Sequence, residues 1–144
     1  MKFALFTKLA LLTSATGVLG TTVAYDRAYD DRSTPLTSVA CSDGPHGLIV
    51  RGYTTFGDLP NFPFIGGAEA VEGYDSANCG SCWNITYTNP AGRNKTITML
   101  AVDGTTRGFV LGVRAADILT GGQAVHLGRV NATAKRVAVS VCRL

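Results

Sequence analysis

The four cysteines could form a redox-active pair, a zinc site or structural disulfides, and their spacing helps to distinguish these. Cys79 and Cys82 form a Cys-x-x-Cys pair, with Cys41 upstream and Cys142 near the end of the chain. A redox-active pair should precede a helix, whose N-terminus lowers the pKa of a thiol, but residues 83–88 alternate in a way that predicts a strand. A zinc site would need two more ligands, and the two histidines lack the usual paired spacing. We therefore predict two structural disulfides that join the central pair to the outer cysteines, and the sequence does not rank the two ways of pairing them.

The first 20 residues have the pattern of a secretory signal peptide. Lys2 and Lys8 precede a short apolar run at 9–12, and small residues follow as far as Gly20. We predict cleavage after Gly20 or after Ala24. The apolar run is too short to span a bilayer, so we predict a secreted, extracellular protein without membrane insertion, where disulfides persist.

Charge and length narrow the class of protein further. Without the two lysines of the leader, the chain has 11 basic and 10 acidic residues. Because the basic residues do not cluster, we do not expect nucleic acid as a partner. Roughly 120 remaining residues suffice for one domain with its own core, and we expect a monomer that needs no cofactor and no metal.

Three Asn-x-Thr triplets begin at Asn84, Asn94 and Asn131, and such triplets are acceptors for N-glycans only where they are exposed. Asn94 is the best candidate because residues 89–94 have turn chemistry. Asn84 lies in a predicted strand, where crowding would hinder the transferase.

The elements that must position these residues are mostly strands. Alternating or apolar runs predict strands at 25–31, 36–41, 83–88, 96–102 and 136–142, and 109–111 is a further apolar run. Residues 113–119 have helical spacing that ends at Gly121. We predict a long aromatic loop at 47–67 and short helical turns at 68–71 and 123–127. With no repeats and no linker, this pattern indicates one compact barrel with small helices.

The residues resemble the cerato-platanins, small secreted fungal proteins, across essentially all of 21–144. The matching segments are 25–26 (YD), 29–31 (YDD), 39–44 (VACSDG), 64–68 (FIGGA), 78–83 (NCGSCW), 101–103 (AVD), 119–124 (LTGGQA) and 128–130 (GRV). The resemblance implies a mainly β fold, a six-stranded double-psi β-barrel with small peripheral helices, similar to expansins and barwin-like proteins. It also implies the disulfides Cys41–Cys79 and Cys82–Cys142.

The resemblance further implies a non-lytic activity. Proteins of this family bind chitin or N-acetylglucosamine oligomers, loosen polysaccharide aggregates including cellulose as expansins do, and elicit defence in plants. The expected partners are therefore cell-wall polysaccharide and a host receptor.

Asp103 is the carboxylate that we expect to bind the saccharide. It lies at the end of a predicted strand, where it either caps an Asp-Gly turn or, as the resemblance implies, lines a groove. Hydrolysis of a glycosidic bond usually needs a second carboxylate about 5–9.5 Å away. Three acidic residues are candidate partners: Asp43, Glu69 and Asp75. No sequence spacing relates any of them to Asp103, so we assign Asp103 to binding and predict no catalytic residue.

Other side chains are expected at the groove or in the core. The residues that could contact sugar hydroxyls beside Asp103 are Thr105, Tyr25, Tyr29, Asp43 and Gln123. Trp83 and Phe109 are predicted core residues, with the loop at Phe109 bordering the groove. Val110 and residues 104–107 depart from the usual residues of the family, so we expect a shifted ligand preference.

Two other functions are compatible with these residues. One is a weak glycoside hydrolase that uses Asp103, and the other is a surface-active structural protein of the wall.

Overall fold

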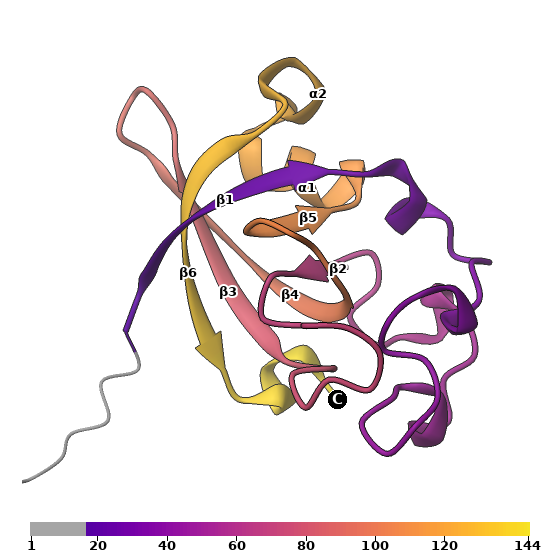
Figure 1. The fold of residues 1–144 in the computed structure, drawn as a ribbon. Coiled ribbons are helices and arrows are strands. Elements are labelled where there is room, and N and C mark those ends of the chain that lie inside the picture. The colour runs from indigo at the N-terminus through magenta and orange to yellow at the C-terminus, as the bar shows by residue number, and fades with distance from the viewer. Residues whose placement is uncertain (1–16) are drawn as a thin grey trace, which may run out of the picture.

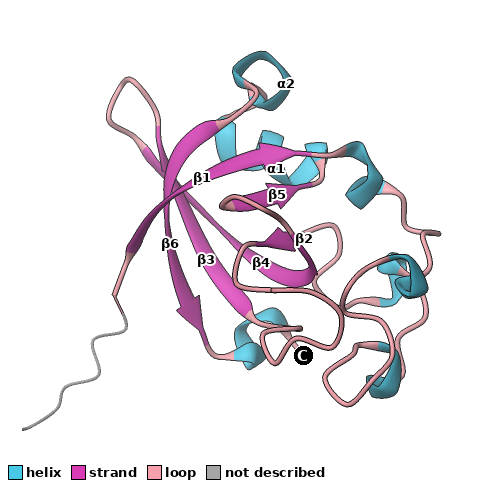
Figure 2. Ribbon diagram, in the orientation of Figure 1, coloured by secondary structure: helices cyan, strands magenta, loops and turns pink. Residues whose placement is uncertain are grey.

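The computed structural model describes residues 17–144, so most of the predicted leader lies outside the described residues. The described residues form one closed barrel in the strand order β1-β5-β2-β4-β3-β6, and β6 returns to β1 (Figure 1). The strands are β1 Leu19–Tyr25, β2 Ile65–Ala68, β3 Cys82–Thr88, β4 Asn94–Gly104, β5 Phe109–Leu111 and β6 Val130–Val137. The helices are α1 Val113–Thr120, α2 Ala124–Leu127 and the short 3₁₀ helices η1 Arg27–Asp30, η2 Leu36–Ser38, η3 Ile49–Arg51, η4 Phe56–Asp58 and η5 Val139–Cys142 (Figure 2). The predicted six-stranded barrel with small helices is confirmed, and its double-psi connectivity stays a prediction.

The β3–β4 hairpin and β6 make up one wall of the barrel. Ile85 of β3 pairs with Ile97 of β4 and with Ala134 of β6, and all three side chains are buried. Thr86 follows Ile85 and faces outward, because successive side chains of a strand point to opposite faces. The strands predicted at 83–88 and 96–102 are confirmed.

Helix α1 is fixed at both ends. At its start, the Asp30 carboxylate accepts hydrogen bonds from the backbone N–H groups of Val113 (2.7 Å) and Arg114 (3.0 Å). At its end, Gly121 has φ 68°, a left-handed conformation that favours glycine. The predicted helix at 113–119 and its glycine stop are confirmed, and the predicted turn at 123–127 contains α2.

Three predicted strands are wrong. Residues 25–31 and 36–41 contain η1 and η2, and residues 136–142 contain the end of β6 followed by η5. Strand β6 ends at Val137 because its partner β3 begins opposite, at Cys82, and among residues 17–144 no strand lies beside the residues that follow. β1 ends at Tyr25, which pairs with the last residue of β5.

The loop predicted at 47–67 is more structured than expected, because it contains η3, η4 and most of β2. The helical turn predicted at 68–71 is a tight turn instead. In it, the N–H of Val71 donates to the carbonyl of Ala68, 3.0 Å away.

The position of β1 in the barrel favours one of the two predicted cleavage sites of the leader. Cleavage after Ala24 would leave only Tyr25 of this seven-residue strand. Cleavage after Gly20 would keep Val23 paired with Phe109 of β5 and Val130 of β6. We therefore expect the mature chain to begin at Thr21 rather than at Tyr25.

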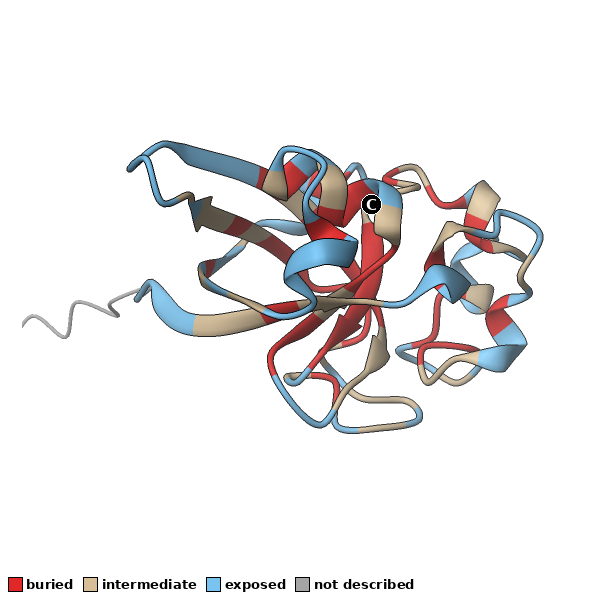
Figure 3. Ribbon diagram, turned by 90° about the horizontal axis from the view of Figure 1, so that it is seen from above, coloured by how far each residue is buried: buried red, intermediate tan, exposed pale blue. Residues whose placement is uncertain are grey.

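Two disulfides tie the outer segments to the barrel. One joins Cys41 to Cys79 and the other joins Cys82 to Cys142, which are the pairs that the resemblance implied. The first bond holds the layer of loops that lies beside the barrel (Figure 1). Buried residues run through the barrel and into this layer, whereas loop tips are exposed (Figure 3). Across 17–144, no helix is both long and apolar enough to cross a membrane.

Candidate functional site

Asp103 is half-buried in the penultimate position of β4 and already holds three hydrogen bonds. One carboxylate oxygen accepts from the backbone N–H of Ala40 (3.1 Å) and of Gly104 (2.9 Å), and the other accepts from the Tyr29 hydroxyl (3.1 Å). The bond to Gly104 is the turn-capping contact anticipated for Asp-Gly. A carboxylate has about four acceptor positions, so about one remains for a ligand hydroxyl.

Tyr29 is the neutral donor in this cluster. Its side chain is buried, and its ring stacks on Phe56 with centroids 5.9 Å apart. Burial, followed by the nearby charge of Asp103, raises the pKa of Tyr29 well above its ordinary value of 10.0. The hydroxyl therefore stays protonated and keeps Asp103 in place.

This raised pKa predicts a loss of stability at alkaline pH. Above the ordinary pKa the unfolded tyrosine ionises while folded Tyr29 stays protonated, so the stabilisation present at lower pH is lost as pH rises. We expect the free energy of unfolding to fall as the pH rises above about 10, the ordinary pKa of tyrosine, and to fall less in Tyr29→Phe. Denaturant titrations of both proteins across this range measure the difference. Equal slopes for the two proteins would contradict the assignment.

Gly67 is buried and packs closely beside Asp103. The two residues pair between β2 and β4. A methyl group on Gly67 would lie 3.3 Å from the Tyr29 hydroxyl and 3.5 Å from Cβ of Thr105. Asp103, Tyr29 and Thr105, three of the predicted site residues, are thus brought together around a glycine that sequence analysis did not single out.

The other three predicted residues have different surroundings. Tyr25 ends β1 opposite Leu111. Asp43 is exposed, lies 3.4 Å from the Ser42 hydroxyl, and raises the pKa of Tyr74 through a hydrogen bond. Gln123 lines a hollow with the turn of the β3–β4 hairpin, at the opposite end of β4 from Asp103.

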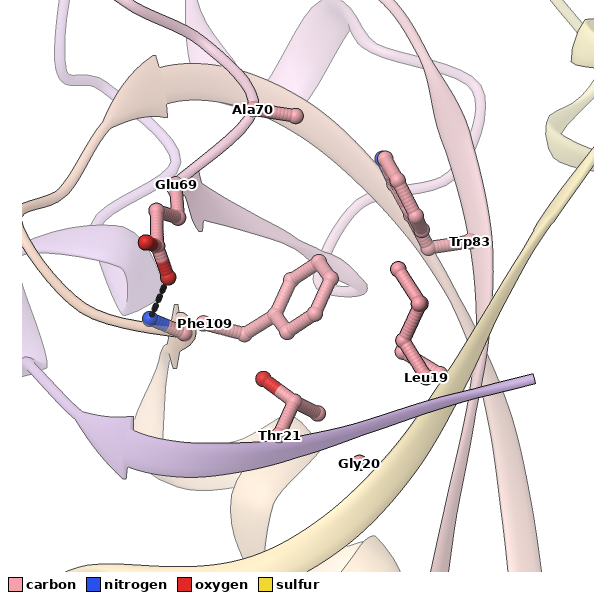
Figure 4. Close-up of a pocket in the computed structure, with 9 residues that line it drawn as sticks. Leu19, Gly20, Thr21, Glu69, Ala70, Trp83 and Phe109 are labelled. Atoms are coloured by element: carbon pink, nitrogen blue, oxygen red, sulfur yellow. Dashed lines mark hydrogen bonds between the residues drawn. The ribbon is translucent and has the colours of Figure 1, made fainter. Parts of the chain in front are cut away.

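A pocket of about 300 Å³ lies among β1, β3 and β5 and was not predicted (Figure 4). Trp83 and Phe109 meet edge to face at its base, with ring centroids 5.3 Å apart. Both rings are buried, which confirms their predicted core role, and Leu19 closes one side. At the rim, one oxygen of Glu69 accepts from the N–H of Gly108 (2.9 Å). Cleavage after Gly20 would remove Leu19 and open the aromatic base.

The Asp103 cluster and the aromatic pocket flank the end of β2. Glu69 follows Gly67 by two residues, which is roughly 7 Å of extended chain. The region therefore offers hydrogen-bonding groups on one side and apolar ring edges on the other.

The three acidic residues considered as catalytic partners of Asp103 have contacts of their own. Glu69 accepts from Gly108, Asp75 from the N–H of His46 (2.8 Å), and Asp43 approaches Ser42. None of these contacts is shared with the Asp103 carboxylate. Within residues 17–144, no three acidic, histidine or cysteine side chains gather in a way that could hold a metal ion.

Comparisons with known proteins agree on one family. The sequence profile named Cerato-platanin matches residues 21–144. The heat-stable 19 kDa antigen of Coccidioides posadasii is 43% identical, over all of this chain and 99% of that protein. The crystal structure of cerato-platanin 1 from M. perniciosa has a TM-score of 0.82 at 46% identity, covering 85% of this chain and 98% of that one. The solution structure of the fungal elicitor Cerato-Platanin has a TM-score of 0.72 at 37% identity, covering 84% and 95%.

Proposed function

The chain belongs to the cerato-platanin family, and from this membership we propose that it is a secreted protein that binds and loosens cell-wall polysaccharide without cleaving it. Chitin and its N-acetylglucosamine oligomers are the proposed ligands, with cellulose as a second substrate. One relative is described as a fungal elicitor, and we extend that role to this chain. The two disulfides fit an extracellular location.

The observation that carries the proposal is the fixed carboxylate of Asp103. Three donors hold it near Thr105, and Asp103 itself is only half-buried. An acceptor that is already immobilised costs little entropy when a sugar hydroxyl binds. The aromatic pocket beyond β2 would contact the apolar face of a ring, and saccharide sites combine both kinds of contact.

The alternative of a weak hydrolase is less well supported. Acid catalysis requires a carboxyl group that gives a proton to the leaving oxygen. Asp103 instead accepts hydrogen bonds from three donors. Carboxylate oxygens that are already engaged as acceptors suit binding better than proton donation.

Replacement of Asp103 by asparagine is expected to weaken binding of a chitin tetramer about tenfold, because a hydrogen bond to a charged group becomes a neutral one. The measurement is a titration followed by amide NMR shifts in the parent protein and in Asp103→Asn. Thr105→Val should reduce affinity to a smaller extent. Gln123→Ala is the control and should bind like the parent.

Two outcomes would count against the proposal. The first is the absence of saturable shifts in the parent at millimolar ligand, and the second is equal affinity in the parent and Asp103→Asn. Release of reducing sugar from chitin or cellulose, lost in Asp103→Asn, would instead support the hydrolase.

A further inference from the structure

The three Asn-x-Thr triplets, far apart in the sequence, lie on three neighbouring strands. They begin at Asn94 in β4, Asn84 in β3 and Asn131 in β6, and β3 is hydrogen-bonded to both other strands. Residues two apart in a strand point to the same face, so each asparagine shares a face with the threonine of its own triplet.

The strand register places all three triplets on the same face. Thr86 of β3 pairs directly with Thr96 of β4 and with Thr133 of β6, so the three threonines of the triplets form one row across the sheet. The adjacent row, Ile85 with Ile97 and Ala134, is buried in the barrel. The row of threonines therefore belongs to the outer surface of the β4–β3–β6 wall, which we call the triplet face.

The triplet face is polar and uncovered. The hydroxyl groups of Thr86 and Thr96 are 2.7 Å apart, and Thr88 donates to the side chain of Asn94 at 2.7 Å. A shallow hollow of about 240 Å³ lies between β3 and β6 and includes Asn131. The described part of the chain places no other segment over this hollow, whose lining comes entirely from β3 and β6.

The three asparagines differ in how exposed their side chains are to an enzyme that would attach a glycan. Asn94 is exposed and is the first residue of β4, directly after the hairpin turn. Asn131 is exposed and is the second residue of β6. Asn84 is half-buried in the central strand, between Thr98 and Lys135, and its side-chain oxygen accepts from Thr98 at 3.0 Å.

We propose that the triplet face is a glycosylated face, with N-linked glycans on Asn94 and Asn131 and none on Asn84. The donor is an oligosaccharide linked to a lipid pyrophosphate. A bond forms between Nδ2 of the asparagine and the anomeric carbon of the first sugar, and the bond from that carbon to the pyrophosphate oxygen breaks. The proton lost from Nδ2 leaves with the lipid pyrophosphate.

The glycans would lie far from the candidate ligand site. Asn94 and Asp103 are at opposite ends of β4, nine residues apart, which is roughly 30 Å along an extended strand. In Figure 1 the β3–β4 hairpin extends away from the layer of loops that contacts Asp103. Glycans on the triplet face would therefore shield that wall and leave the end of β2 free. The inference rests on the secretion in the proposed function, but not on sugar binding.

The test is the full chain secreted from a yeast that makes N-glycans. Purified protein is treated with peptide N-glycosidase in ¹⁸O water, which converts each glycosylated asparagine to a labelled aspartate, and peptides are identified by mass spectrometry. We expect labelled aspartate at positions 94 and 131 and unlabelled asparagine at position 84. Asn94→Gln and Asn131→Gln should each remove one glycan from the intact mass, whereas Asn84→Gln should leave the mass of the glycans unchanged.

Secreted protein without glycans, or with a glycan on Asn84, would overturn the inference and leave the proposed function standing. A chain that stays inside the cell would overturn both. The ligand titration tests the glycosylation inference independently of the proposed function, because the affinity for chitin tetramer should be the same before and after deglycosylation. A change in affinity on deglycosylation would contradict the separation of the two faces.

Discussion

A chain with both Cys82 and Cys142 replaced by alanine is expected to lose about 4 kcal/mol of unfolding free energy. The two residues are 60 positions apart, and both are fully buried. Removing the bond frees the unfolded chain from a long closed loop, which raises its entropy. It also releases η5 from the start of β3, and the exposed side chains of Val139 and Val141 offer little packing to hold this helix in place.

Denaturant unfolding of the parent and the double variant, without reductant, measures this loss. The matched control is the pair Cys41 and Cys79, which are 38 positions apart. Removal of this second disulfide should lower the free energy of unfolding by nearly the same amount, because the entropy of loop closure depends only on the logarithm of loop length. A loss below about 1 kcal/mol for Cys82 and Cys142 would mean that packing alone holds the end of the chain.

Gly66→Ala is expected to destabilise the fold by about 3 kcal/mol or more. Gly66 lies in β2 with β4 on one side and β5 on the other. A methyl group there would overlap the backbone carbonyl oxygen of Val110, which cannot move without breaking the pairing of β2 with β5. The melting temperature and the denaturant midpoint both report the effect.

The neighbouring variant Gly67→Ala is the milder comparison. Its methyl group would lie 3.2 Å from the carbonyl oxygen of Gly104, a tight contact without overlap, so the expected loss of stability is about 1 kcal/mol. The same methyl group would crowd the Tyr29 hydroxyl and Thr105, and we expect it to weaken chitin-oligomer binding. If Gly66→Ala proved as stable as Gly67→Ala, the close packing of β2 against β5 would be wrong.

Residue patterns in the sequence correctly predicted the elements that are stabilised by contacts between residues close in sequence. The hairpin of β3 and β4 alternates buried Ile85 and Ile97 with outward threonines, and α1 ends at a glycine that the helix stop requires. β2 contains two glycines in four residues and has little strand propensity, so only its position between β4 and β5 makes it a strand. The valines of 137–141 alternate equally well, but no partner strand in the described part of the chain extends beyond Val137.

The candidate site was predictable only in part, for the same reason. Asp103 and Thr105 follow a recognisable strand, and Tyr29 lies in a segment that resembles the family. The N–H of Ala40 reaches Asp103 through the path of a loop 63 residues away in sequence, which no local pattern encodes. The aromatic pocket likewise combines Trp83, Phe109 and Glu69 from three separate segments.

The pairing of β1 with β6 has a consequence for biosynthesis. β1 is the first strand to leave the ribosome and β6 is the last, and Cys142 follows β6. The β3–β4 hairpin can form early because its contacts are local, but the barrel stays open until the final segment has been synthesised. Until then the edges of β1 and β3 can pair with other chains. Chains that terminate before β6 should therefore be the aggregating and degraded fraction of the nascent protein.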